Sequence, residues 1–90
     1  MYKILPYTFE KAKQLGVYIK PSTRKNKKLD IYDGNYQYIT SVGDIRFLDF
    51  PTYYKKKGKE YAEKRRNLYH LRNKDYELGT RGFYAKELLW

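Results

Sequence analysis

The sequence predicts an α+β fold: a small antiparallel sheet, arranged as a β-hairpin or meander, packed against one long basic helix near the carboxyl end, plus a short helix near the amino end. Two observations carry this prediction. The turn sequence Asp33-Gly34-Asn35 separates two runs rich in β-branched and aromatic residues, which is typical of a β-hairpin. Between residues 52 and 73, apolar side chains recur at spacings of three, four and seven, which is typical of one face of a helix.

The first twenty residues predict a strand, a helix and a second strand. Residues 1–5 are mostly apolar and are followed by a proline, which would stop a short strand. Thr8 is a suitable N-cap for a helix over residues 9–15, and Gly16 is a suitable C-cap. Residues 17–20, "VYIK", favour a strand.

The hairpin around Asp33 leaves two registers open. A two-residue turn would pair Ile31 with Tyr36, whereas a three-residue loop would pair Leu29 with Ile39. A second turn at Gly43-Asp44 predicts a further strand after it. We therefore expect three or four strands in all.

A long helix is predicted from Thr52 to about Asn73. Gly58 weakens this helix by about 1 kcal/mol relative to alanine, and it marks either the true beginning of the helix or a close contact with a neighbour. The residues expected to pack the helix on the sheet are Tyr54, Tyr61, Ala62, Leu68 and Tyr69. The residues expected on the opposite side are Lys59, Glu63, Arg66 and His70.

The final stretch, "GTRGFYAKELLW", predicts a turn over residues 79–82 and then a short apolar helix. Its apolar side chains would be costly to expose on so small a domain, since burying each one contributes roughly 1.5–3 kcal/mol. We therefore expect this segment to be structural, with Phe83, Leu88, Leu89 and Trp90 buried.

Ninety residues predict one domain, residues 1–90. The absence of cysteine excludes disulfides, thiolate nucleophiles and thiolate metal sites. No apolar run is long enough to span a membrane, and the first residues lack the apolar region of a signal peptide. A protein that is neither secreted nor membrane-spanning is expected.

The net charge of +10 makes a polyanion the expected partner, because cations that neutralise phosphates release counterions. The excess is concentrated: residues 51–75 alone carry +6, and residues 20–28 hold five cations and no anion. The twelve tyrosines could build a core or stack on bases. The predicted nucleic-acid-binding residues are Lys20, Arg24, Lys25, Lys27, Lys28, Lys55, Lys56, Lys59 and Arg66. Arg65 and Arg72 flank the apolar stripe of the long helix, so we expect their stems to pack and their heads to pair with carboxylates.

No enzymatic activity, cofactor or metal site is expected. His70, the only histidine, lies near Arg66 and Lys74, whose charges disfavour the imidazolium form. A solvated surface histidine is the simplest interpretation. Turn chemistry accounts for Asp33 and Asp44, and the acidic residues lack the spacing of a calcium loop. No phosphate-cradling glycine loop and no nucleophile elbow is present.

Two stretches, "DFPTYYKKKGKEYAEKRRNLYHLR" and "GTRGFYAKELLW", resemble the carboxy-terminal signature of a family of small, basic, functionally uncharacterised proteins. Double-stranded DNA viruses, including bacteriophages and giant viruses, encode this family. The matching positions are the Asp-aromatic-Pro-Thr-Tyr start at residues 49–53, the double arginine at 65–66, Tyr69, Arg72, and residues 82–90. The resemblance implies a viral protein of the host cytoplasm or the virion, and it leaves the activity open.

Three functions are compatible with these features. The first is a nucleic-acid-binding accessory protein that makes sequence-independent phosphate contacts. The second is a virion or assembly component that docks acidic protein surfaces, since tyrosine, tryptophan and arginine dominate interface anchors. The third is an inhibitor of a host factor, which a viral origin allows but no residue indicates.

Overall fold

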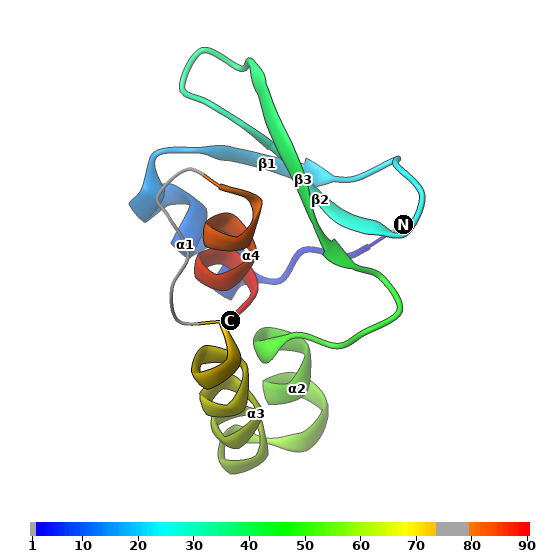
Figure 1. The fold of residues 1–90 in the computed structure, drawn as a ribbon, viewed down its shortest axis with the longest axis vertical. Helices are drawn as coiled ribbons and strands as arrows, with labels where there is room; N and C mark the ends of the chain where they lie inside the picture. Colours follow the sequence, from blue (N-terminus) through cyan, green and yellow to red (C-terminus); the bar gives the residue numbers. More distant parts are fainter. Residues whose placement is uncertain (1, 74–79) are drawn as a thin grey trace.

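The computed structural model describes residues 2–73 and 80–90, and it confirms the α+β class. Three strands, β1 (Tyr18–Pro21), β2 (Lys27–Tyr32) and β3 (Tyr38–Asp44), form an antiparallel sheet in the order β1-β2-β3. The helices of the described part are α1 (Pro6–Leu15), α2 (Phe50–Lys57), α3 (Lys59–Arg72) and α4 (Arg81–Leu89). The sheet lies towards one end of the longest axis, and α2 and α3 lie at the other (Figure 1).

The main core lies between one face of the sheet and the helices α1 and α4 (Figure 1). Its almost fully buried side chains are Ile4, Ala12, Leu29, Ile31, Val42, Leu88 and Leu89. The burial of the last two confirms that the carboxy-terminal helix is structural, while Phe83 and Trp90 are half-buried. The helix that packs on β3 is therefore α4, and the prediction that the long basic helix crosses the sheet is wrong.

Helix α4 comes close to the sheet at Gly43. This glycine has a φ of 82°, and a Cβ atom on it would lie 2.8 Å from Cδ1 of Leu89. A larger residue would force the side chain of Leu89 or that of Lys28 to shift, so the close packing of α4 on β3 depends on glycine here. The turn predicted at Gly43-Asp44 lies slightly later, because β3 continues through Asp44 and the Phe47 N–H then donates to the Asp44 carbonyl at 3.0 Å. The expected further strand is absent, since residues 45–49 form no strand.

The amino-terminal prediction is correct for the helix and wrong for the first strand. Residues 2–5 form no strand, and α1 begins at Pro6. Proline suits the first turn of a helix because its fixed φ is helical and its missing N–H would have no partner there. Thr8 therefore lies within the helix and is buried, and it is not the predicted N-cap. Gly16 is the C-cap, as predicted.

The hairpin of β2 and β3 is confirmed, but both predicted registers are wrong. The connection is longer than expected: residues 33–37 form the loop, and a register shift follows Ile31. Asp33 holds this loop together, because its Oδ1 accepts hydrogen bonds from the backbone N–H groups of Asn35 (2.8 Å) and Gln37 (3.0 Å). The observed pairs are Leu29 with Val42, Ile31 with Thr40, and Tyr32 with Tyr38.

The predicted long helix is two helices that break at Gly58. This residue has φ 91° and ψ 172°, values that only glycine adopts readily, and it separates α2 from α3. The two helices pack on each other, with the rings of Tyr53 and Tyr61 5.5 Å apart. Asp49, not Thr52, is the N-cap of α2, and its carboxylate accepts a hydrogen bond from the Thr52 N–H. A helix start at Gly58, one of the two interpretations of that glycine, is thus correct for α3.

The apolar stripe predicted for the long helix is only partly buried. Ala62 is fully buried and Tyr69 is half-buried. Tyr54, Tyr61 and Leu68 each leave more than two fifths of their surface exposed. The break at Gly58 turns the two halves of the stripe in different directions, so one continuous buried face cannot form.

Candidate nucleic-acid interface

The sheet has a face that the core does not use. Cross-strand partners in a sheet point to the same side. The core side therefore holds Ile19 with Ile31, and Leu29 with Val42. The other side holds Tyr18 with Tyr32, and Lys20 with Asp30. We call the residues Tyr18, Lys20, Arg24, Tyr32, Tyr36 and Tyr38 the tyrosine face.

The four tyrosines of this face contact one another in pairs. The rings of Tyr18 and Tyr36 stack with centroids 4.3 Å apart and planes 18° apart. The rings of Tyr32 and Tyr38 meet edge to face at 6.1 Å. Tyr18, Tyr36 and Tyr38 leave 46%, 65% and 46% of their surface exposed. The neighbouring Tyr18 side chain raises the pKa of the Tyr36 hydroxyl.

Two cations of the predicted binding set lie over these rings. The Nζ atom of Lys20 is 5.4 Å from the ring centroid of Tyr32, and the Cζ atom of Arg24 is 4.7 Å from that of Tyr38. Neither cation forms an ion pair with any described residue. Both residues are exposed. The structure therefore brings aromatic rings together with two cations that form no ion pair with a described residue, on one open surface.

Asp30 lies on the same side of the sheet as the tyrosine face, and its hydrogen bonds hold two residues of that face in place. Its buried carboxylate accepts hydrogen bonds from the hydroxyls of Ser22 (2.7 Å) and Ser41 (2.6 Å). Ser22 Oγ also accepts a hydrogen bond from the Arg24 N–H at 3.0 Å, and Ser41 shares one with the Tyr38 hydroxyl at 2.7 Å. The network fixes the backbone of Arg24 and the ring of Tyr38, which is the pair in cation–π contact.

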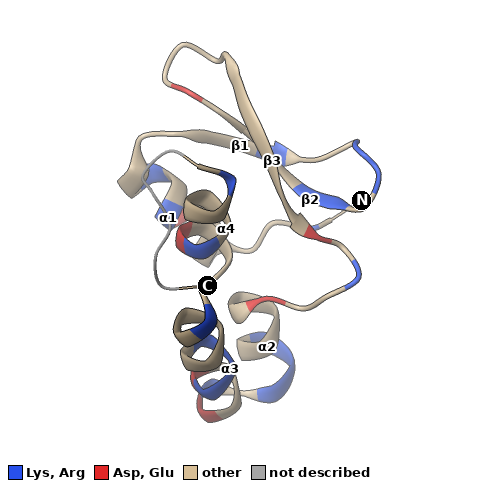
Figure 2. Cartoon of the chain, viewed as in Figure 1, with Lys and Arg blue, Asp and Glu red and all other residues tan. Residues whose placement is uncertain are grey.

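The remaining predicted cations lie elsewhere. Lys25 is exposed on the β1–β2 connection, and Lys27 is half-buried at the start of β2. Lys55, Lys56 and Lys59 are exposed on α2 and at the start of α3. Figure 2 shows that these two groups lie on separate parts of the molecule, at the β1–β2 connection and on the helical pair. They do not form the single basic surface that the sequence predicted.

Lys28, one of the predicted phosphate contacts, lies inside the protein and not on its surface. It is 4% exposed, and its Nζ atom lies 2.7 Å from Oδ2 of Asp49. The Tyr2 hydroxyl donates to the same oxygen at 2.7 Å. Burial, and secondarily the Asp49 charge, raises the pKa of the Tyr2 hydroxyl. Asp49 is 21 residues from Lys28 in the chain, which the sequence pattern could not connect.

Arg66 was expected on the solvent side of the long helix, and it is half-buried. Its Cζ atom lies 4.3 Å from the ring centroid of Phe50, so it packs α3 on α2. The break at Gly58 causes this difference, because it folds α2 back against the face of α3 that carries Arg66. Replacing Arg66 should therefore lower stability as well as remove a charge.

His70 is also more enclosed than predicted. It is half-buried, and its Nε2 atom has no hydrogen-bond partner among the described residues. Burial, and then the charges of Lys86 and Arg66, lower its pKa from the ordinary value of 6.5. The predicted direction of the charge effect at Arg66 is correct, and Lys74 lies outside the described residues. The Trp90 backbone and the charge of Glu87 oppose the shift.

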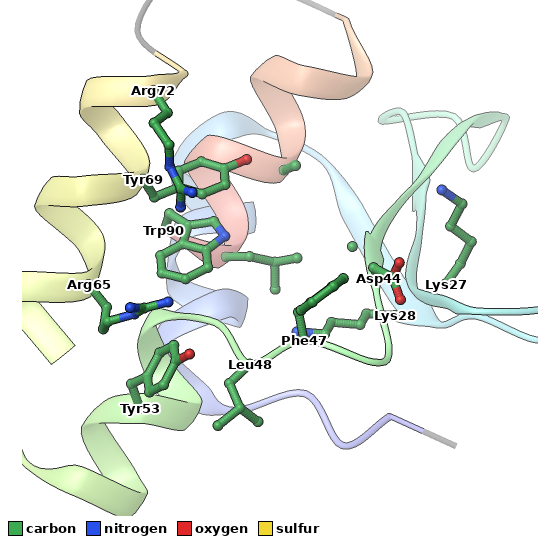
Figure 3. A pocket seen from close by; sticks show the side chains of 13 residues that line it. Lys27, Lys28, Asp44, Phe47, Leu48, Tyr53, Arg65, Tyr69, Arg72 and Trp90 are labelled. Atoms are coloured by element: carbon green, nitrogen blue, oxygen red, sulfur yellow. The ribbon is translucent and has the colours of Figure 1, made fainter. Parts of the chain in front are cut away.

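A cavity of about 480 Å³ opens between the β2–β3 edge of the sheet, α3 and the end of α4 (Figure 3). Basic and aromatic side chains dominate its lining, among them Lys27, Arg65, Tyr69, Arg72 and Trp90. Their positions in the sequence predict that Arg65 and Arg72 pair with carboxylates, but neither forms an ion pair among the described residues. The spacing of seven residues, which places Arg65 and Arg72 on one face of a helix, was the signal in the sequence that could have indicated a shared site.

The described part of the chain contains no cluster of three or more acidic or histidine side chains suited to hold a metal ion. None of the described helices is both long and apolar enough to cross a bilayer. No protein-family model, curated protein or solved structure matches this chain.

Proposed function

We propose that this protein binds nucleic acid without sequence specificity, and that the tyrosine face is its main contact surface. The observation that carries the proposal is the placement of Lys20 over Tyr32 and of Arg24 over Tyr38. Surfaces that bind single strands combine exposed aromatic rings, on which bases stack, with cations that meet the phosphates. The net charge of +10 supports the same reading.

Single strands are the favoured substrate. The tyrosine rings need unstacked bases as partners, and the bases of a duplex are already stacked on each other. The sequence carries no base-reading motif, so the phosphate backbone would supply most of the affinity. The exposed Lys55, Lys56 and Lys59 would add attraction at a distance.

The resemblance to viral proteins extends the proposal. Under it, the protein is a virus-encoded accessory factor that meets nucleic acid in the host cytoplasm or in the virion. The resemblance alone supports this origin and location.

Binding to a fluorescent oligothymidine at several salt concentrations tests the proposal. The affinity of the parent should fall by about 0.7 log unit per log unit of salt for each phosphate neutralised on a single strand. Lys20→Gln/Arg24→Gln should flatten that slope. Lys3→Gln/Lys13→Gln is the matched control, because it removes two exposed charges away from the tyrosine face. An equal effect of both double variants would mean diffuse electrostatics and no dedicated surface.

Exposed apolar residues on α3 favour a second candidate, a virion or assembly component. Leu68 and Leu71 leave 42% and 68% of their surface exposed, and their spacing of three places them on one side of the helix. Such a patch fits a protein partner. Capture of partners from infected cells with and without nuclease separates the candidates, since a protein contact should survive the nuclease. Leu68→Ser/Leu71→Ser should then abolish it.

A further inference from the structure

The cavity beside α3 carries positive charge that the described residues do not neutralise. Arg65 and Arg72 extend from α3 towards Trp90, and Lys27 lies on the opposite side of the cavity (Figure 3). None of these three forms an ion pair with a described residue. The Nε atom of Arg65 is buried, and no described residue accepts its hydrogen bond. A buried donor without an acceptor is costly, so a small movement of Arg65 towards an anionic ligand in the cavity would relieve that cost.

The other charged groups of the lining are already paired. Lys28 is held by Asp49 at 2.7 Å. The carboxylate of Asp44, the one described acidic side chain of the lining, is bound by the guanidinium of Arg46 at 2.6 Å. The hydrogen bonds from Arg46, and more weakly the charge of its cross-strand neighbour Lys27, lower the pKa of Asp44 to about 2. Among the described residues, Arg65 and Arg72 therefore give the cavity most of its surplus charge, and Lys27 adds a charge that Asp44 and Arg46 share with it.

Aromatic side chains form much of the remaining wall. The Trp90 and Tyr69 rings stack with centroids 4.5 Å apart and planes 6° apart, which fixes the indole at the cavity. Tyr53 lies beside Arg65, whose Cζ atom is 5.5 Å from its ring centroid. Phe47 also lines the cavity and is 66% exposed. Flat aromatic surfaces beside forked cationic donors suit a ligand that has both an aromatic ring and a phosphate.

We propose that this cavity binds a nucleoside 5′-phosphate, with its phosphate at Arg65 and Arg72 and its base against the aromatic wall. A cavity of about 480 Å³ falls within the range of small-molecule sites, roughly 300–1,000 Å³. The ligand could be a free mononucleotide or the 5′-phosphorylated end of a strand, since both present the same chemistry. The residues of this site are separate from the tyrosine face, so the inference goes beyond the proposed function and does not depend on it.

Fluorescence of Trp90, the single tryptophan, provides a direct readout. The full chain is titrated with the common nucleoside 5′-monophosphates, with the corresponding nucleosides and with inorganic phosphate, each corrected for absorption. The nucleotides should give a saturable change, and nucleosides and phosphate should bind at least about tenfold more weakly, because each lacks half of the contacts. A nucleoside that binds as tightly as its nucleotide, or no saturation by any nucleotide at about 1 mM, would overturn the proposal.

Variants test the assigned residues. Arg65→Gln and Arg72→Gln should each weaken nucleotide binding about tenfold or more, since each removes a charged hydrogen-bond donor. Lys64→Gln is the matched control, because Lys64 is exposed on the same helix and does not line the cavity, and it should bind like the parent. Because Arg65 also packs on Tyr53, Lys27→Gln at the strand end gives a second test that does not disturb α3. Unchanged affinity in all three lining variants would reject the site.

Two further titrations identify the source of the ligand and separate this site from the tyrosine face. The first titration uses a tetranucleotide with and without a 5′-phosphate. If the phosphorylated form binds better, and Arg65→Gln weakens its binding, the ligand is a strand end. If only mononucleotides bind in a way that depends on Arg65, the ligand is a free nucleotide. Lys20→Gln/Arg24→Gln should leave nucleotide binding unchanged, so that either proposal can fail without the other. Loss of nucleotide binding in that variant would contradict a separate site.

Discussion

The ammonium nitrogen of Lys28 lies 2.7 Å from Oδ2 of Asp49, and both side chains are almost completely buried. Asp49 also caps α2 through the Thr52 N–H at 3.0 Å and accepts the Tyr2 hydroxyl at 2.7 Å. One carboxylate thus joins the amino-terminal segment, β2 and the helical pair. Lys28 therefore stabilises the fold from inside, although the residues around it in the sequence form a basic cluster.

Replacing Lys28 with methionine should lower the free energy of unfolding by about 3–5 kcal/mol, because Asp49 would keep a buried charge without its cation. Urea unfolding followed by circular dichroism measures the change. Lys25→Met, on the exposed connection, is the control and should stay within about 0.5 kcal/mol of the parent. A Lys28→Met protein as stable as the parent but weaker in binding DNA would restore Lys28 as a phosphate ligand.

Gly58→Ala should destabilise the protein. The φ of 91° and ψ of 172° at this position are strained for any residue with a Cβ atom, at a cost of about 1–3 kcal/mol. The opposite sign is expected if α2 and α3 were one helix, since alanine would then stabilise it by about 1 kcal/mol. Thermal unfolding of this variant decides between the two, with Gly34→Ala as a control at a position without positive φ.

His70 should make the protein less stable as the pH falls. Burial lowers the pKa of His70 in the folded state below its ordinary value of 6.5. The unfolded chain therefore binds the proton first, and stability that is fully present above about pH 6.5 is lost below it. When the pH is lowered from about 8 to about 5, the melting temperature of His70→Gln should fall less than that of the parent. Parallel curves for the two proteins would show that His70 titrates normally.

Local signals in the sequence predicted the elements that local chemistry determines. The Asp33-Gly34-Asn35 turn identified the hairpin, and the apolar carboxy-terminal run identified α4. Register was not predictable in the same way, because a five-residue loop closed by the Asp33 side chain competes with shorter turns. The break at Gly58 was also ambiguous, since a glycine inside a helix costs only about 1 kcal/mol.

The candidate site was predicted less well than the fold, because burial depends on contacts between distant residues. Lys28 resembles its exposed neighbours in sequence, and only the approach of Asp49 removes it from the surface. The nearness of Arg24 to Tyr38, fourteen positions apart in the printed sequence, depends on the strand pairing. The cavity lined by Arg65 and Arg72 forms only when the sheet, α3 and α4 come together. The sequence around these two arginines therefore could not reveal it, and pairing with carboxylates was the simpler expectation.

The central claim is that the tyrosine face binds single-stranded nucleic acid. Amide chemical-shift mapping with a short oligothymidine at low salt tests it most directly. We expect the largest shifts at Tyr18, Lys20, Arg24 and Tyr38, with small shifts at the exposed Lys55. Tyr38→Ala should weaken binding by about 1–3 kcal/mol, the contribution of one stacked base. Shifts confined to α2 and α3, or no binding even at low salt, would contradict the claim.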